Sequence, residues 1–397
     1  MSVDSSMSAS AFPVSKNLHV LTLTPFYPRL GDEANGCFVA EPLPWNEKLG
    51  ISQSVLAVRP FYYGRGEAIG SFHPAEWRSF FSFPSGIGLP SAGAFLFASI
   101  LPEVRRLHAT NPVHVIHAHS ALPSGHAAAL ISRELGIPFI VTVHGLDAYS
   151  TNQVNGLPGR WCERVSRMVY RSAQTVVCVS EKVREHVLAG AKGRVETVVI
   201  YNGVDTELFS PANESQDAQT ILSVGTLIPS KGHELLLRAF AEVHSEFPIV
   251  SLKIIGEGAE RQRLGQMSSE LNIANKVAFV GRQKRSAIAD AMKHCVLFAL
   301  PSLYEGLGCV YLEAMATAKP VIACSGQGIE EVIHNGFNGL LVAPGDIAGL
   351  ASALRQLLQN PALRAALGRE ARRGILHEFT LAHQAAQMAE IYQGCAR

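Results

Sequence analysis

The sequence predicts an α/β protein with two domains, each built around a doubly wound parallel sheet. Short apolar runs bounded by glycine and proline alternate with helical segments along most of the chain, which is typical of strand–helix–strand units. A length of 397 residues allows two or three domains, each with its own core. Residues 210–218 are polar and contain a proline, and they separate two such series of strands.

The first domain is predicted over residues 18–209. Residues 1–17 precede it, and they are interpreted as a disordered lead-in because they are rich in serine and lack the apolar segment of a secretory signal. Helices are expected at 37–49, 124–135 and 181–189. Apolar runs that predict strands occupy residues 19–25, 52–58, 113–119, 138–147, 174–180 and 195–201.

Residues 77–107 differ in character from the rest of this domain. Their large apolar side chains are interrupted by helix breakers, namely Pro84, Gly86, Gly88, Pro90 and Gly93. These breakers argue against a membrane-spanning helix. Two interpretations stay open: a packed loop and helix, or an amphipathic surface that contacts lipid or another apolar molecule. Arg105 and Arg106 favour the second interpretation only slightly.

Histidines stand at the ends of two consecutive predicted strands. His119 closes the run 113–119, and His144 and Asp147 close the run 138–147. Open parallel sheets bind ligands at the carboxyl ends of their strands. Imidazoles can donate hydrogen bonds to sugar hydroxyls and phosphate oxygens near neutral pH. Histidine at two neighbouring strand ends therefore favours a binding site over a purely structural role, and no third side chain has the spacing of a metal ligand.

The second domain is predicted over residues 219–378, after the linker 210–218. Its first helix is expected at 233–245, and residues 360–392 are expected to be helical with a bend near 378–381. The predicted strands are 220–225, 251–256, 276–281 and 296–300.

Candidate ligand residues follow these strands. Gly225 and Gly256 end the first two strands, and Arg282 follows the third. An arginine in this place can stack on a base, or it can simply lie on the surface. Lys231 beside Gly232 at a helix start suits a diphosphate, because it combines a point charge with backbone donors. A solvated loop lysine is the alternative.

Residues 301–316 contain the strongest candidate site in the sequence. An apolar strand leads into Glu305, two nearby glycines and a helix predicted to start between Gly306 and Gly308. Glu305 and Glu313 would then lie about two turns apart on roughly one helix face. Glycines let backbone N–H groups approach a ligand, and a helix N-terminus attracts phosphate. The stretch predicts a phosphate-plus-sugar site, although Glu305 as a helix cap and Glu313 as a solvated side chain remain alternatives.

The order of these motifs resembles the retaining glycosyltransferases of family 4, which carry an E-x7-E signature and have the GT-B fold. Residues 301–316 match the signature, and the blocks 318–323, 326–333 and 339–346 follow in the order of that family. The resemblance runs from about residue 18 to the C-terminus. It implies two Rossmann-like domains facing across a cleft, with a last helix, 379–397, that crosses back to the first domain.

The resemblance also assigns roles in the second domain. Glu305 would contact the transferred sugar and Glu313 the ribose hydroxyls, while Leu307 and Gly308 would offer N–H groups to the diphosphate. Lys231 would bind the same diphosphate.

In the first domain, the resemblance matches His119 to a sugar-contacting histidine, places His144 on a second shared motif and puts Gly36 beside the donor phosphates. The sequence departs from many family members at Thr226, where they carry an arginine that clamps the diphosphate with the lysine. The expected catalytic residues are Glu305, His119 and Lys231. The expected donor-binding residues are Gly36, His144, Gly225, Thr226, Lys231, Gly256, Arg282, Leu307, Gly308 and Glu313.

Composition limits the remaining function classes. A net charge of +1 gives no support to nucleic-acid binding driven by bulk charge. Seven scattered cysteines without a C-x-x-C pair fit reduced thiols in a cytosolic protein. The sequence has no G-x-G-x-x-G for a dinucleotide, and no D-x-D of the kind that holds a metal-bound diphosphate in the other major transferase fold.

These observations predict a retaining, metal-independent enzyme that needs no cofactor and moves a sugar from a UDP- or GDP-sugar to a glycan or lipid-linked acceptor. The variant Val224–Gly232 resembles the exopolysaccharide and teichuronic-acid branch of the family, which implies surface polysaccharide assembly. A cytoplasmic enzyme, with peripheral contact at the inner face of the plasma membrane through 77–107, is expected. The alternatives are a nucleotide-sugar epimerase or a phosphorylase of the same fold, and an inactive homologue that binds sugar nucleotides.

Overall fold

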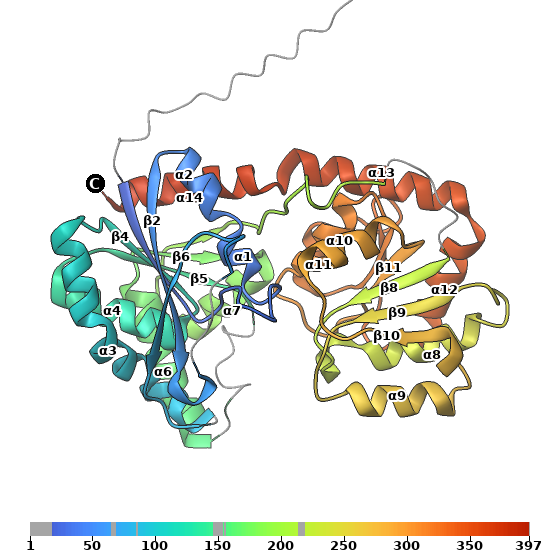
Figure 1. Cartoon of the computed structure of the whole chain (residues 1–397), viewed down its shortest axis with the longest axis horizontal. Coiled ribbons are helices and arrows are strands. Elements are labelled where there is room, and N and C mark those ends of the chain that lie inside the picture. Colours follow the sequence, from blue (N-terminus) through green and yellow to red (C-terminus); the bar gives the residue numbers. More distant parts are fainter. Residues whose placement is uncertain are drawn as a thin grey trace, which may run out of the picture.

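Two lobes, each with one parallel sheet, lie side by side in the computed structural model (Figure 1). The structure describes residues 18–64, 69–84, 86–145, 154, 156–212 and 219–396. The lead-in 1–17, Asp147 and most of the expected linker 210–218 lie outside these residues. A seven-stranded and a six-stranded sheet, both with parallel pairing throughout, confirm the predicted fold class.

The sheet of the N-terminal lobe has the order β3-β2-β1-β4-β5-β6-β7. Because its strands are all parallel, their carboxyl ends meet at one edge. The central strand β1 is buried along its whole length, as expected for a sheet covered on both faces. β3 was not predicted, because only one of its five residues is fully buried. The strands are β1 (Leu18–Thr24), β2 (Ile51–Pro60), β3 (Glu76–Phe80), β4 (Val115–His119), β5 (Phe139–Val143), β6 (Thr175–Cys178) and β7 (Thr197–Val199).

The three helices predicted by range in this lobe are present, one of them divided and one extended, whereas α6 was not predicted. The expected helix 37–49 is divided in two, because Pro42 and Pro44 cannot donate to the carbonyls four residues earlier. The helices are α1 (Cys37–Ala40), α2 (Leu43–Lys48), α3 (Leu89–Thr110), α4 (His126–Leu135), α6 (Gly156–Ser172) and α7 (Glu181–Ala191). Short turns lie at η1 (Phe61–Tyr63), η2 (Gly86–Gly88) and η3 (Ala121–Gly125).

Helix α3 corrects the expectation that prolines and glycines interrupt residues 77–107. Pro90 lies in the first turn, where proline is tolerated, and the helix continues through Pro102. Within the described residues, Gly86–Thr110 is the stretch that is long and apolar enough to cross a membrane by length and composition. In this structure α3 packs against α4 and α6, and it buries Leu96, Ile100 and Val104 at four-residue spacing.

The sheet of the C-terminal lobe has the order β10-β9-β8-β11-β12-β13. Its strands are β8 (Thr220–Val224), β9 (Ser251–Ile255), β10 (Val277–Phe279), β11 (Leu297–Ala299), β12 (Val321–Cys324) and β13 (Leu340–Val342). Its helices are α8 (His233–Val243), α9 (Arg261–Glu270), α10 (Arg285–Lys293), α11 (Cys309–Ala316), α12 (Ile347–Gln359) and α13 (Pro361–Glu378), with short turns at η5 (Pro229–Lys231), η6 (Ala274–Lys276) and η7 (Gly328–Glu331).

The last helix, α14 (Leu381–Cys395), extends from the C-terminal lobe back across the N-terminal lobe, as the red ribbon of Figure 1 shows. The chain bends between α13 and α14, where Val204 N donates to Phe379 O at 2.9 Å and Leu381 N donates to Val204 O at 3.3 Å. α14 then packs on α2 and β1, and it buries Tyr392 in a core shared with Leu18 and Ile140. The C-terminal segment is therefore part of the first lobe's core.

Candidate active site

A cavity of about 460 Å³ lies between the lobes and is lined by residues of both. We call it the interlobe cavity. It brings together every site residue predicted from the sequence except His119. Those lining it are Gly36, His144, Gly225, Thr226, Lys231, Gly256, Arg282, Glu305, Leu307, Gly308 and Glu313.

A lysine and a serine hydroxyl both donate hydrogen bonds to the Glu305 carboxylate. Lys231 Nζ donates to Glu305 Oε1 at 2.5 Å, and Ser302 Oγ donates to the same oxygen at 3.0 Å. The backbone N–H of Glu305 donates to Gln327 Oε1 at 3.1 Å, which fixes the loop. Only 7% of Glu305 is exposed, so its free oxygen is presented to the cavity and to little else. A ligand with a negative charge could pair with this lysine, and a ligand with hydroxyl groups could donate hydrogen bonds to this buried carboxylate.

The geometry of α11 differs in one respect from the prediction. The helix begins at Cys309, so Glu305 lies in the non-helical loop before it and does not share a helix face with Glu313. Gly308 takes a left-handed φ of 87°, and a Cβ there would lie 2.6 Å from the Tyr311 ring. This turn directs the first N–H groups of α11 towards the cavity, where a helix N-terminus favours an anion.

Glu313 is paired to an arginine that the sequence analysis did not single out. Arg285 Nη1 donates to Glu313 Oε1 at 2.5 Å, and Arg285 Nη2 donates to Glu41 Oε1 of the other lobe at 2.8 Å. All three side chains are largely buried. Burial raises the pKa of Glu41 to about 7, although Arg285 opposes that shift. Arg285 therefore links the wall of the cavity to the N-terminal lobe, and we call these three residues the Arg285 cluster.

A second set of contacts joins the lobes beside α11. Ser180 Oγ, at the start of α7, donates to Gly306 O at 2.6 Å. A Cβ on Gly306 would lie 2.2 Å from His144 O, so only glycine permits this approach. Glu331 accepts from the N–H of Glu181 at 2.8 Å. The loop that carries Glu305 is thus seated directly on the N-terminal lobe.

The predicted histidines form a buried row behind the cavity. His119 Nδ1 lies 2.9 Å from His144 Nε2, and His117 lies between Thr142 Oγ1 and Tyr392 OH, each at 2.7 Å. Burial lowers the pKa of His144 to about 3, so its ring is neutral. His144 reaches the interlobe cavity, whereas His119 lines a smaller adjoining cavity of about 30 Å³. His119 therefore contacts the His144 ring, which lines the interlobe cavity, but His119 does not line that cavity.

Close backbone approaches shape the cavity in both lobes. A Cβ on Gly256 of the C-terminal lobe would lie 1.9 Å from Gly225 O, and a Cβ on Gly36 of the N-terminal lobe would lie 2.3 Å from Phe26 C. Thr226 lines the cavity without bringing a charge. Arg282, for which a base contact was expected, makes an ion pair with Asp32 of the N-terminal lobe at 3.2 Å. The cations among the lining residues are Lys231, Arg282 and Arg285.

The described parts of the chain were compared with the geometry of metal sites and disulfides. No group of three or more histidine, cysteine, aspartate or glutamate side chains there has the geometry to hold a metal ion. All seven cysteines are free thiols.

Comparisons with known proteins agree with this arrangement. Residues 204–374 match the family described as Glycosyl transferases group 1, and residues 63–208 match Glycosyltransferase Family 4. An uncharacterized glycosyltransferase from Methanocaldococcus jannaschii is 32% identical over 256 residues, which are 64% of this chain and 68% of the relative. A glycogen synthase from Mycobacterium tuberculosis is 28% identical over 288 residues, covering 71% of this chain and 69% of the relative.

Solved structures share the fold over nearly the whole chain. Sucrose-phosphate synthase from Thermosynechococcus elongatus superposes with a TM-score of 0.74 at 22% identity, covering 95% of this chain and 98% of that one. HepE from Anabaena, in complex with UDP-glucose, has a TM-score of 0.74 at 22% identity and covers 94% and 99%. With a family 4 N-terminal lobe, a group 1 C-terminal lobe and the two-sheet architecture of these structures, the chain belongs to the glycosyltransferases of the GT-B fold.

Proposed function

We propose that this protein is a retaining, metal-independent glycosyltransferase that moves a sugar from a nucleoside diphosphate donor to a glycan or lipid-linked acceptor. The observation that carries the proposal is the convergence of Lys231, Glu305 and Glu313 on one cavity that also contains the N-terminus of α11. Surface polysaccharide assembly on the cytoplasmic side of the membrane is the setting that the sequence resemblance supports.

In the proposed donor complex, each wall of the cavity recognises one part of the nucleotide sugar. The diphosphate lies at the N–H groups of Leu307 and Gly308 and takes the Lys231 ammonium as its counter-ion. Glu305 accepts hydrogen bonds from hydroxyls of the transferred sugar. Glu313 accepts from the ribose hydroxyls, which requires that it share or exchange its Arg285 partner. Arg285 is also the buried cation of this wall that could supply the charge missing at Thr226.

The chemical step is a substitution at the anomeric carbon. The bond from that carbon to the leaving phosphate oxygen breaks, and a bond to the acceptor oxygen forms on the same face of the sugar. The acceptor proton passes to the leaving phosphate, so no side chain is assigned as the general base. Lys231 and the amide groups stabilise the charge on the diphosphate, and lobe closure excludes water. His144 lines the sugar side of the cavity, and His119 holds its ring in place.

Relatives support a nucleotide-sugar donor of this class. One structural neighbour is a complex with UDP-glucose, and one relative from Mycolicibacterium smegmatis is described as a GDP-mannose-dependent mannosyltransferase. A thermal-shift screen against UDP-, GDP- and ADP-sugars should therefore find a class that raises the melting temperature, because a ligand that binds only the native state stabilises it by mass action.

Replacing Lys231 or Glu305 by alanine should lower the transfer rate by at least about 100-fold, because each removes a charge that acts on the leaving group or the sugar. The measurement is release of free nucleoside diphosphate with the donor found by the screen. Glu270→Ala, on the exposed surface of α9, is the control and should keep full activity. Full activity in Lys231→Ala or Glu305→Ala would refute the assignment.

The same assay separates the alternatives. A transferase releases nucleoside diphosphate faster when acceptor is added. An epimerase interconverts the donor sugar without acceptor and releases no nucleoside diphosphate. An inactive homologue would show a thermal shift with the donor but neither release nor interconversion.

A further inference from the structure

Large aromatic side chains gather, exposed, on one part of the N-terminal lobe. Phe61, Phe81 and Phe83 are 54%, 46% and 50% exposed, although rings of this size are usually buried. The rings of Phe61 and Phe81 stack at 5.7 Å, and the Phe81 ring lies 5.0 Å from that of Phe95. We call Phe61, Tyr62, Tyr63, Phe81, Phe83 and Phe95 the aromatic cluster.

The aromatic cluster lies at the same sheet edge as the interlobe cavity. η1 follows the carboxyl end of β2, and Phe81 and Phe83 follow the carboxyl end of β3. His144 directly follows β5 in the same parallel sheet, so these residues share one edge. In Figure 1 α6 lies low in the N-terminal lobe, whereas β5 and β6 run towards the C-terminal lobe.

Helix α6 continues this surface with apolar and basic side chains. Its outward residues Leu157, Trp161 and Met168 are 78%, 52% and 39% exposed, while the opposite face packs into the core. η2, which lies between the cluster residues 83 and 95, packs against α6. The exposed arginines Arg160 and Arg164 have no carboxylate partner among the described residues.

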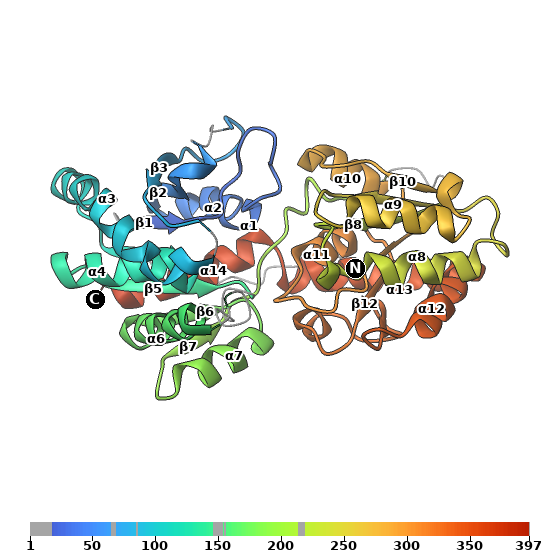
Figure 2. The same cartoon turned by 90° about the horizontal axis from the view of Figure 1, so that it is seen from below.

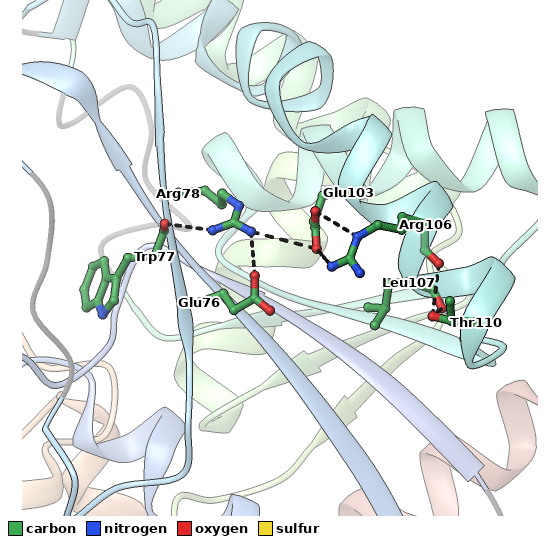
Figure 3. Close-up of polar contacts among 7 residues, drawn as sticks. All are labelled: Glu76, Trp77, Arg78, Glu103, Arg106, Leu107 and Thr110. Atoms are coloured by element: carbon green, nitrogen blue, oxygen red, sulfur yellow. Dashed lines mark hydrogen bonds and ion pairs between the residues drawn. The ribbon is translucent and has the colours of Figure 1, made fainter.

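On the β3 side of the aromatic cluster, two arginines are paired with carboxylates. Arg78 of β3 pairs with Glu76 at 2.5 Å and approaches Glu103 of α3 at 3.8 Å, and Arg106 pairs with Glu103 at 2.5 Å (Figure 3). This network ties β3 to α3 and neutralises Arg78 and Arg106. In the part of the chain that the structure describes, the unpaired basic side chains near the exposed rings are therefore those of α6 and Arg59, whose guanidinium lies 5.6 Å from the Tyr63 ring.

We propose that the aromatic cluster and the outward face of α6 dock on an anionic lipid bilayer. Aromatic rings prefer the boundary between headgroups and acyl chains, and arginines bind lipid phosphates. Contiguous exposed apolar surface of this kind marks an interaction site in a soluble fold. α3 need not leave the lobe for this contact, because Phe95 is 37% exposed while Leu96, Ile100 and Val104 stay in the core.

Docking in this way would bring the β2 and β3 part of that sheet edge to the membrane, and the same edge leads on to the interlobe cavity. A lipid-linked acceptor could then reach the interlobe cavity from the bilayer without crossing water. This part of the inference rests on the proposed function, whereas lipid binding itself does not. α6 carries four arginines and one glutamate, and this excess of positive charge in a nearly neutral protein favours contact with anionic lipid.

The test is co-sedimentation of the whole protein with vesicles. We expect binding to vesicles of phosphatidylcholine plus phosphatidylglycerol, weaker binding to phosphatidylcholine alone, and loss at high salt. Phe83→Ser with Trp161→Ser, and Arg160→Glu with Arg164→Glu, should each lower the partition coefficient by about tenfold or more. Ile249→Ser with Phe337→Ser, and Arg369→Glu, change equally exposed residues of the C-terminal lobe and should bind as the unaltered protein does.

Two results would overturn the inference. One is equal binding of the cluster variants and the control variants. The other is retention of the unaltered protein on an immobilised soluble glycan, lost in the cluster variants, with no binding to vesicles, which would make the surface a sugar platform. Donor-induced thermal shifts, measured in parallel, should be unchanged in the cluster variants. Failure of lipid binding with intact donor shifts would leave the proposed function standing.

Discussion

His117 and His144 are imidazoles that burial keeps neutral, with the pKa of each lowered to about 3. Between that value and the ordinary pKa of about 6.5, the unfolded chain binds protons that the native protein does not. The free energy of unfolding should therefore fall as the pH falls through this window, by about 1.4 kcal/mol per pH unit for each such histidine. His117→Gln should remove one histidine's share of that slope, measured by urea unfolding between pH 6.5 and 4.5.

The control for this prediction is His377→Gln, because His377 is 79% exposed and its replacement should leave the slope unchanged. Glu41 acts in the opposite sense. Its raised pKa, about 7, means that the native state holds a proton more tightly, so its stabilising share declines as the pH rises from about 4.5 to 7. The contribution of Glu41 is the same in His117→Gln and His377→Gln, so it cancels when the pH dependence of the two variants is compared. An unchanged slope in His117→Gln would show that the buried ring is not the source.

Site residues were predictable from the sequence where their neighbours along the chain indicate a function. Lys231 before a helix, and Glu305 before a glycine turn, were placed in one site by local pattern and by resemblance, and the structure brings them into contact. Arg285 was missed because its partner Glu41 is 244 residues away on the other lobe. An arginine at a helix start carries no local sign that it will be buried across an interface.

The bend between α13 and α14 depends on the turn after β7. Gly203 packs against the bend, and a Cβ there would lie 2.5 Å from Thr380 O. Gly203→Ala should therefore lower the free energy of unfolding by about 1–3 kcal/mol, the usual cost of overpacking. Gly190→Ala is the control, because no heavy atom lies within 4 Å of its Cβ position in α7, and it should be neutral or stabilising by about 1 kcal/mol. Equal stability of both variants, measured by urea unfolding, would contradict this account.

Helices and strands were predictable from the sequence where the apolar periodicity and the positions of glycine and proline indicated the same boundaries. Most strands with apolar runs and the bend near 378–381 were predicted from the sequence, since burial on both faces leaves a clear apolar signature. β12 was not predicted as a strand, although all four of its residues are buried. β3 was missed because it is a half-exposed edge strand, and α3 was underestimated because prolines in a first turn and a packed interior do not end a helix. The start of α11 was misplaced by up to three residues because the glycines form the turn before it.

For the whole molecule, the Arg285 cluster is a charged bridge between the lobes. Arg285→Met keeps most of the volume but leaves Glu41 and Glu313 buried without their cation. The free energy of unfolding should fall by roughly 3–5 kcal/mol at neutral pH, as for other broken buried pairs. Small-angle scattering should show a larger radius of gyration, because the lobes lose a contact across the cleft.

The matched control for Arg285→Met is Arg355→Met. Arg355 pairs with Glu246 at 2.7 Å on the surface of one lobe, and surface pairs contribute about 0–1 kcal/mol. A loss of stability in Arg285→Met no larger than in this control, with an unchanged radius of gyration, would show that the cluster does not hold the lobes together.

The crossing of α14 also has a consequence for how each molecule is made (Figure 2). His117 in β4 reaches its partner Tyr392 only across 275 residues. While the ribosome is still adding the C-terminal lobe, the nascent first lobe has an open apolar groove where α14 will lie. Domains usually fold in order of synthesis, but here the core of the first lobe is complete only after α14 has been made. Synthesis of α14, and not completion of the first half of the chain, is then the step that allows the first lobe to become native.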